Sequence, residues 1–267
     1  MTGRLLYKYV AFDKPMNVLK LITESSIKFT APIEFNDPFD CNPCYKNSES
    51  PQKERPDLFA RLDMLHKSPA EELSARQRAI NRTNAVFNDG SFHKQALAGV
   101  GILSLSRTPW HVLMWSHYAA NHTGFVAEFE EPSSFPSGIG DYHHQWLIPF
   151  EVTYTNDRPV IDRWGDIDDD KVNQVFMYKS SEWAYEEEER VIKYRGGPGI
   201  FGYEPSLLKS IIAGCNISDE NFSLLSSAVK QSNRGRKRKV QLYRAKLDDK
   251  RYELKIPGMK KPRSQIT

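Results

Sequence analysis

The alternation of hydrophobic and polar residues predicts short strands interleaved with helices. Strand patterns occur at 5–10, 27–30, 147–154 and 208–213, helical spacing occurs at 16–25, 167–178 and 217–230, and the stretch 101–130 has the pattern of strand, turn, short helix and strand. A polar, mostly helical segment at about 57–97 predicts an insertion. Since no repeat or linker divides the chain, we expect one α+β domain over 1–256, followed by a basic, flexible tail at 257–267.

The stretch Gly101–Glu130 concentrates groups that bind small polar ligands. Hydroxyl and imidazole side chains gather there around two indoles. Such groups hydrogen-bond polar ligands and stack on flat ones, which predicts a small-molecule site. The alternative is a half-buried helix with a solvated polar face. The residues that matter most for this prediction are Ser104, Ser106, Trp115, His117 and Tyr118.

The sequence WAYEEEER at Trp183–Arg190 is the second candidate for chemistry. As a strand it would place Glu186, Glu188 and Arg190 on one face. A row of carboxylates is costly unless a cation lies opposite. We interpret one carboxylate as stabilising a developing positive charge, with Arg190 as its orienting partner. The alternative is a solvated acidic edge or the end of an exposed helix.

The segment Phe35–Asp40, FNDPFD, predicts a turn that ends in proline. Its two phenylalanines would anchor the loop to the core. We expect a structural role for this turn first. Contact of Asp37 or Asp40 with a ligand is the alternative.

Cysteine content and hydropathy narrow the class of protein. No run approaches the roughly 18 apolar residues of a membrane span, so we expect no membrane partner. Three cysteines do not make a disulfide framework, which favours a cytoplasmic protein. Cys41 and Cys44 have the spacing of a zinc pair, but no second pair completes a tetrahedral site, so we expect no metal.

The net charge is only +3, but basic residues are concentrated near the end of the chain. Clusters of this kind neutralise phosphates and predict a nucleic-acid partner, whereas a solvated turn is equally compatible with the pattern. The residues expected to bind nucleic acid are Arg234, Arg236, Lys237, Arg238 and Lys239.

Several motifs together resemble a known bacterial family. They are YKY near the start, FNDPFD, SLS followed by MWSHYAANHTGF, and W-x-YE-x-E-x-R. Over about residues 5–215 they resemble the family catalogued as domain of unknown function 2971. The order of elements is also similar to the compact ADP-ribosyltransferase fold, especially that of DarT-like and RES-like toxins. This second resemblance implies a split mixed or antiparallel sheet.

The resemblance to ADP-ribosyltransferases also implies roles for particular residues, with NAD as the substrate. Lys8 or Tyr9 falls at the first-strand position that contacts the dinucleotide. Ser104 or Ser106 falls at the middle-strand position, and Glu188 or Glu186 at the catalytic glutamate. The opening strand lacks the usual His or Arg, and SLS replaces the more usual STS. Aromatic groups such as Trp115 and Tyr118, with His117, would clamp the nicotinamide.

We therefore expect an NAD-dependent ADP-ribosyltransferase, a bacterial toxin or phage-defence effector that modifies nucleic acid or protein and has an antitoxin or inhibitor as a partner. The first alternative is a metal-independent nuclease or nucleic-acid-binding module that uses His117 and His122 with the Glu186/Glu188 pair. The second is a non-enzymatic regulatory binding protein. The three hypotheses share the same candidate pocket.

Overall fold

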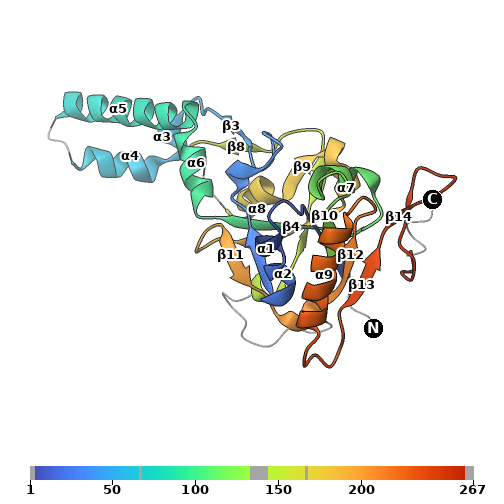
Figure 1. Ribbon diagram of the computed structural model, residues 1–267. Helices are drawn as coiled ribbons and strands as arrows, with labels where there is room; N and C mark the ends of the chain where they lie inside the picture. The colour runs from blue at the N-terminus through green and yellow to red at the C-terminus, as the bar shows by residue number, and fades with distance from the viewer. Residues whose placement is uncertain (1–3, 66–67, 133–143, 166–167, 262–267) are drawn as a thin grey trace.

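A computed structural model describes residues 4–65, 68–132, 144–165 and 168–261 of the chain. A seven-stranded sheet forms its centre (Figure 1), with strands in the spatial order β13 (Gln241–Arg244), β12 (Leu208–Ala213), β5 (Phe125–Glu130), β1 (Leu5–Val10), β4 (Gly101–Ser106), β10 (Glu188–Lys193) and β6 (Phe150–Glu151). Strands β12 and β13 run parallel, and the other neighbouring pairs are antiparallel. The prediction of an α+β fold with a mixed sheet is confirmed.

The sheet divides between β1 and β4. These two strands pair at one position, Tyr7 with Ser106. By contrast, β1 pairs with β5 at six positions, and β4 pairs with β10 at six. The two halves of the sheet are therefore joined at a single cross-strand pair, and side chains near that junction have room to line a cavity.

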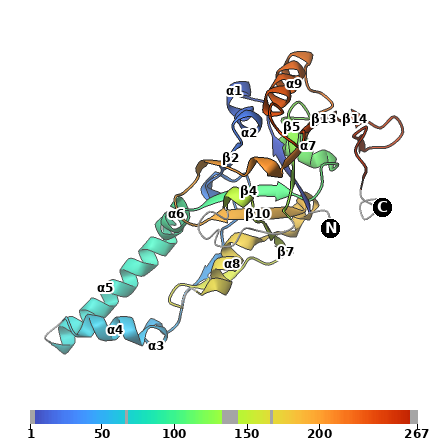
Figure 2. The same cartoon turned by 90° about the horizontal axis from the view of Figure 1, so that it is seen from below.

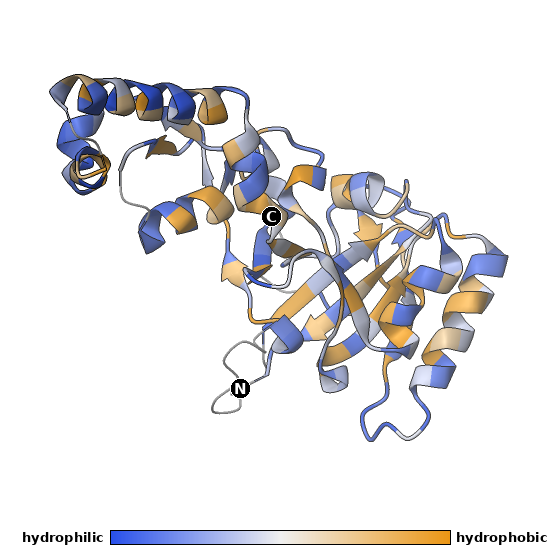
Figure 3. Cartoon of the chain, turned by 90° about the vertical axis from the view of Figure 1, so that its left-hand side faces the viewer, coloured by the Kyte–Doolittle hydropathy of each residue, from blue (hydrophilic) through white to orange (hydrophobic). Residues whose placement is uncertain are grey.

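One face of the sheet is covered by α1 (Pro15–Val18), α2 (Lys20–Thr23) and α9 (Asp219–Ser232). Ser218 begins α9 by accepting a hydrogen bond from the Asn221 amide, and acidic residues in the first turn complement the helix dipole. Apolar side chains of α9 pack on the central strands, which carry the strongest hydrophobic colouring in Figure 3.

The opposite face is covered by α7 (Val112–Tyr118), and α8 (Asp169–Met177) packs beyond β4 and β10. Helix α7 packs on β1 through Met114 and Trp115, which are both buried. Its remaining side chains, His117 and Tyr118 among them, stay partly accessible. The helix therefore presents one apolar face to the core and one polar face beside the junction of the two half-sheets.

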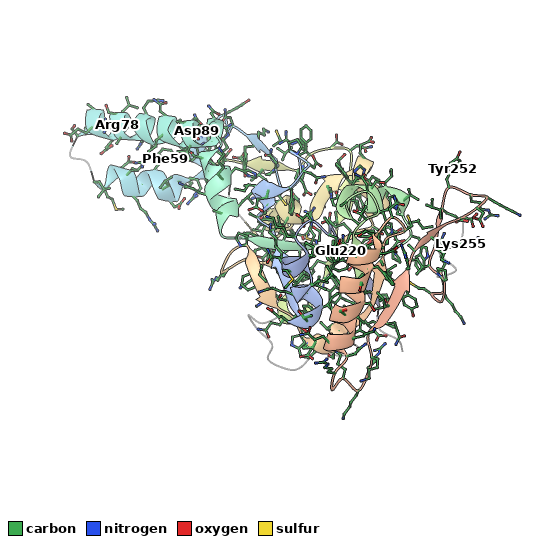
Figure 4. All side chains as sticks on the ribbon, in the orientation of Figure 1. Phe59, Arg78, Asp89, Glu220, Tyr252 and Lys255 are labelled. Carbon is green, nitrogen blue, oxygen red and sulfur yellow. The ribbon has the colours of Figure 1, made fainter. Side chains whose placement is uncertain are left out.

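Three helices occupy the segment predicted as an insertion, and α3 (Pro51–Glu54) precedes it. They are α4 (Pro56–Asp63), α5 (Pro69–Asn88) and α6 (Ser91–Ala98). Helices α4 and α5 project from the body as an arm (Figures 1 and 2), and Figure 4 labels Phe59 on α4 and Arg78 on α5. The Ser68 side chain caps α5 by accepting a hydrogen bond from the Glu71 amide.

Short strand pairs and 3-10 turns complete the described residues. The pairs are β2 (Ser26–Phe29) with β11 (Gly199–Gly202), β3 (Cys44–Lys46) with β8 (Val160–Asp162), β7 (Thr153–Thr155) with β9 (Tyr178–Ser180), and β14 (Lys246–Leu247) with β15 (Leu254–Lys255). The 3-10 turns include η1 (Pro32–Glu34), η3 (Ser181–Glu186) and η4 (Pro205–Leu207). The basic tail is described only as far as residue 261, so its last residues lie outside the described ranges.

The segment Trp183–Arg190 differs from the predicted strand. Its first part forms η3, Glu187 has a left-handed backbone with φ 44°, and β10 begins only at Glu188. Glu186 therefore reaches the same region as Glu188 from a 3-10 turn, and not by strand alternation. Glu188 and Arg190 do lie on the same face of a strand, as predicted, because β10 is regular where they lie.

Candidate active site

A cavity of about 360 Å³ opens where β1 and β4 separate. Its walls come from β1, the η1 turn and the loop after it, β4, α7, β9, η3 and the start of β10. The volume lies within the range of roughly 300 to 1,000 Å³ that is usual for small-molecule sites. Segments between Tyr7 and Glu188, far apart in the chain, therefore meet at one concave site.

Five buried charged groups form a cluster at one side of this cavity. The Lys179 Nζ donates to a carboxylate oxygen of Glu186 and, at 2.9 Å, to Oε2 of Glu188. Arg190 donates to both oxygens of Glu188, at 2.9 and 3.0 Å, and at 2.6 Å to Oδ2 of Asp40. Each buried charge has an opposite charge in contact, which is the condition under which ions are tolerated away from water.

The two glutamates of the cluster are shifted in opposite directions. Burial alone would raise the pKa of Glu188, but Arg190 and Lys179 outweigh it and hold that pKa far below its usual range. Burial raises the pKa of Glu186, and Lys179 offsets this effect only in part. Neighbouring carboxyl groups with pKa values pushed apart are a common arrangement of catalytic acids and bases. Glu188 is thus a fixed anion, and Glu186 is the carboxyl group better suited to exchanging a proton.

Tyr118 connects α7 to the charged cluster. Its hydroxyl donates to Oε1 of Glu186 at 2.5 Å, and the Asn36 amide donates to the same hydroxyl at 3.5 Å. Burial, together with the nearby Glu186 carboxylate, raises the pKa of Tyr118. The phenol therefore stays protonated at neutral pH and holds Glu186 in a fixed orientation.

Lys8 enters the same cavity from β1. Its Nζ donates to the Ser104 carbonyl at 3.1 Å. Burial lowers the pKa of Lys8 to about 8, although the nearby Glu188 carboxylate opposes this shift. Ser104 contributes to lowering the pKa of Glu188. Lys8, Ser104 and Glu188 lie on three neighbouring strands and line the same cavity.

The structure places most of the predicted ligand-binding and catalytic residues around this one cavity. The predicted residues that line it are Lys8, Tyr9, Ser104, Ser106, His117, Tyr118, Glu186 and Glu188. Arg190 is fully buried behind Glu188, where its guanidinium orients the carboxylate. Arg190 is therefore a positioning residue.

Trp115 does not lie where the sequence predicted. Its side chain is 0% exposed, and its Nε1 donates to the Pro109 carbonyl at 2.7 Å. Its ring packs edge-on against Tyr9, with the centroids 5.5 Å apart. Trp115 is a core residue that fixes α7 on β1, and it cannot stack on a ligand in the cavity. The apolar side of this short helix had to face the sheet.

The row of glutamates is not a solvated edge. Glu186 and Glu188 are each 3% exposed, and Glu189 is 0% exposed. Glu189 points to the other face of the sheet, where Arg4 Nη1 donates to it at 2.8 Å. The hypothesis of an exposed acidic strand is therefore wrong, because β10 lies between β4 and β6 inside the sheet.

His122, which the nuclease hypothesis required beside His117, lies apart from the cavity lining. Its Nε2 is 3.2 Å from the Ser116 hydroxyl oxygen, and its ring stacks on Trp115 at an interplanar angle of 9°. Its backbone is left-handed, with φ 67°. The structure therefore brings one of the two imidazoles to the glutamate pair, and not both.

Sequence reasoning missed Lys179 and gave Asp40 only a minor role. Both are buried in the charged cluster, 3.6 Å apart between Nζ and Oδ2. The available signal was the row of glutamates itself, because a buried carboxylate pair needs more positive charge than Arg190 supplies. A lysine shortly before WAYEEEER was the candidate to consider.

The basic run after α9 forms an exposed loop that partly binds the body of the protein. Arg236 donates to the Pro205 carbonyl at 2.6 Å, Arg238 bonds with Glu130, and Lys239 donates to the Asn233 carbonyl at 2.8 Å. Arg234 and Lys237 are exposed, and no side-chain bond is seen for either within the described ranges. These two residues are the free cations of the run.

Among the residues that the structure describes, no group of three or more potential metal ligands converges on one point. Cys41 is buried, and Arg190 Nη1 lies 3.5 Å from its sulfur, whereas Cys44 is exposed. Within these same ranges, none of the helices has the length and apolar content required to cross a membrane.

Comparison with known proteins gives no further assignment: no family model, no curated protein and no solved structure matches this chain. The resemblances drawn from the sequence motifs therefore remain hypotheses. The site has to be interpreted from its own geometry.

Proposed function

We propose that this protein is an ADP-ribosyltransferase that cleaves the nicotinamide–ribose bond of NAD in the cavity between β1 and β4. The observation that carries the proposal is the convergence of Lys8, Ser104 and Glu188. These residues lie on neighbouring strands, line one cavity and occupy the three positions that the resemblance to ADP-ribosyltransferases implies.

The chemistry of the residues fits a dinucleotide. Carboxylate and hydroxyl groups hydrogen-bond ribose hydroxyls, and a partly accessible lysine attracts a phosphate. Tyr118 and Phe35 both line the cavity and offer rings against which a flat nicotinamide can pack. With Trp115 in the core, the stacking role falls to these two residues.

Bond cleavage needs a stabilised cation. As the bond between the ribose C1′ and the nicotinamide nitrogen breaks, its electron pair leaves with neutral nicotinamide, and the ribose becomes an oxocarbenium-like cation. The Glu188 carboxylate supplies a negative charge that is already fixed by Lys179 and Arg190, so little reorganisation is needed.

Transfer then needs a base for the acceptor. A nucleophilic oxygen or nitrogen of the acceptor attacks C1′ and gives up its proton. Glu186, whose pKa is raised by burial, is the carboxyl group that we assign to this step. With water as the acceptor the same steps hydrolyse NAD. We propose nucleic acid or protein as the acceptor, a cytoplasmic toxin or phage-defence role, and an antitoxin as the regulating partner, on the resemblance and the basic loop.

The nuclease hypothesis is less well supported, because His122 lies outside the cavity and only His117 accompanies the glutamates. The hypothesis of a non-enzymatic binding protein needs no fixed anion beside an ionisable carboxyl group. Neither alternative accounts for the pairing of Lys179 and Arg190 with Glu188.

Labelled NAD tests the proposal. The purified protein is incubated with NAD carrying the label in its adenylate phosphate, with and without cell lysate, and released nicotinamide and labelled macromolecules are measured. We expect nicotinamide release from the wild type and its loss in Glu188→Gln. Glu187→Gln is the matched control, because Glu187 adjoins Glu188 in the chain but does not line the cavity.

Thermal melting checks that both variants fold. Absence of nicotinamide release by folded wild-type protein, with and without lysate, would overturn the proposal. Equal loss in both variants would remove Glu188 from its assigned role. Cleavage of a labelled oligonucleotide without NAD would favour the nuclease hypothesis.

A further inference from the structure

A second and larger cavity, of about 690 Å³, lies where the helical arm joins the body. Its walls come from α4 and α5 of the arm, from α6 at the base of the arm, and from β8, α8 and β3 of the body. Figure 2 shows the arm leaving the body beside α6. This cavity shares none of its lining residues with the candidate active site.

The second cavity contains a guanidinium with unsatisfied donors. Nε and Nη1 of Arg163 are buried, and neither has a hydrogen-bond partner among the described residues. The guanidinium carbon lies 5.4 Å from the centre of the Phe87 ring. Buried N–H donors without an acceptor are costly, so this arrangement favours an acceptor that arrives with a ligand, and the positive charge of the guanidinium favours an anionic one.

The remaining charges of the lining point to the same sign of ligand. Arg55, Arg82 and Lys171 also line the cavity, against the single carboxylate of Asp162. Asp162 already accepts a hydrogen bond from the Trp164 amide at 2.8 Å. Arg55 and Lys171 are paired with Asp57 and Asp168, so the excess of positive charge comes from Arg82 and Arg163.

Most of the remaining lining is apolar. Val86 of α5 and Phe92 and Leu97 of α6 face Val175 and Phe176 from α8. Two of the polar groups satisfy each other, because the Tyr45 hydroxyl and His93 Nδ1 lie 3.1 Å apart. A ligand rich in hydroxyl groups would find few partners here, whereas an alkyl chain would bury apolar surface along the whole cavity.

We propose that this cavity binds an amphipathic carboxylate of the fatty-acid class, with its carboxylate on Arg163 and its chain between the arm and α8. Arg163 supplies two N–H donors without a partner, Nε and Nη1, and a carboxylate is a charged group that can only accept. The alkyl chain of the ligand packs against apolar walls that face solvent in the free protein. The inference does not depend on the function proposed for the first cavity.

Calorimetric titration of the full chain with decanoate tests this site, with decan-1-ol as a neutral probe of the same chain length. We expect decanoate to bind one site at least about tenfold more tightly than the alcohol, because a charge-assisted hydrogen bond adds to the same apolar burial. Decyltrimethylammonium, which has the opposite charge, should bind more weakly than either.

Variants assign the binding to Arg163. Arg163→Met should weaken decanoate about tenfold and leave decan-1-ol within about twofold, since methionine keeps the apolar stem. Arg163→Lys should retain part of the preference for decanoate. Arg195→Met is the matched control, because Arg195 is exposed and lines neither cavity.

A second variant tests the same cavity if Arg163→Met fails to fold. Ala96→Trp fills the cavity from α6 and should abolish binding of both decanoate and decanol without touching the charge. Equal affinity for decanoate and decanol, binding unchanged in Arg163→Met, or no saturable binding by the folded wild type would each overturn the proposal.

Discussion

The two cavities differ in whether their buried charged groups are paired within the protein. In the first, the carboxylates of Glu186 and Glu188 are paired with Lys179 and Arg190 before any ligand arrives. In the second, the donors of Arg163 are buried without a partner. A paired cluster suits a reaction in which charge develops in the transition state, because groups that are already held in place stabilise that charge without reorganising. An unpaired cation suits a ligand that brings its own permanent charge.

The largest expected effect separates the cavities by function. Glu188→Gln should reduce NAD cleavage about 100-fold or more, because it removes the fixed anion beside the developing cation. The same variant should bind decanoate with wild-type affinity. Nicotinamide release and calorimetry on one protein preparation measure both properties. Loss of decanoate binding in Glu188→Gln would mean that the two cavities are not independent.

The next effect concerns stability within the first cavity. Glu188 has a lowered pKa in the folded protein, so its contribution to the free energy of unfolding is present above the unfolded pKa of about 4.5 and is lost as the pH falls through the folded pKa. Glu186 has a raised pKa, so its ionisation costs stability as the pH rises above about 4.5.

Urea unfolding of Glu188→Gln and Glu186→Gln, repeated about every pH unit from pH 4 to pH 8, measures how the free energy of unfolding of each variant depends on pH. Glu188→Gln should be less stable than the wild type by about 1 to 3 kcal/mol at neutral pH. The deficit of Glu186→Gln should be smaller and should shrink as the pH rises. Identical pH profiles for the two variants would contradict the opposite pKa shifts.

The third effect sharpens the role of the unpaired cation. Arg163→Met should weaken decanoate about tenfold and leave NAD cleavage unchanged. Together with Glu188→Gln, this variant gives a double dissociation of the cavities. A matching fall in NAD cleavage in folded Arg163→Met would show that the second cavity supports the first.

The sequence predicted the strands and the polar residues of the first cavity better than its ion pairs. β1 and β12 have the predicted bounds because their patterns are local, and Ser104 and Glu188 follow from strand alternation. The contact of Asp40 with Arg190 joins residues far apart in the chain, and no local pattern encodes it. Sequence could therefore indicate the acidic row and a nearby lysine as its second cation, but not the contact with Asp40.

The second cavity could not be predicted for the same reason. Its walls join the arm to β8 and α8, and their pairing is decided by tertiary packing. Trp115 shows the converse error. Its clustering with polar residues suggested a ligand site, whereas the seven-residue helix α7 has one apolar face, and the indole had to fill it.

A smaller effect concerns Lys8, the cation of the first cavity that donates to a carbonyl and not to a carboxylate. Burial lowers its pKa to about 8, so Lys8 loses its charge as the pH rises through that value. If Lys8 attracts a phosphate of NAD, kcat/KM for cleavage should fall about fivefold above pH 8 or so. Lys8→Met should be less active near pH 7 and lack this fall. A decline that persists in Lys8→Met would assign it to another group.

The smallest expected effect tests whether nucleic acid is the acceptor. The clean variant is Arg234→Ala with Lys237→Ala, because Arg236 and Arg238 also hold the loop to Pro205 and Glu130. Each phosphate contact adds roughly 0.7 to 0.9 to the slope of log affinity against log salt concentration, so losing two contacts should reduce that slope by roughly 1.4 to 1.8.

The loop variant needs a control of equal charge, and the arm supplies one. Arg61→Ala with Arg78→Ala removes two exposed arginines from α4 and α5, and Figure 4 shows Arg78 far from the body. Binding of a labelled oligonucleotide from about 50 to 200 mM salt compares the two double variants. Equal slopes in the loop variant, the control and the wild type would make the loop a solvated turn and favour a protein acceptor. NAD cleavage without an acceptor should be unchanged, because the loop lines neither cavity.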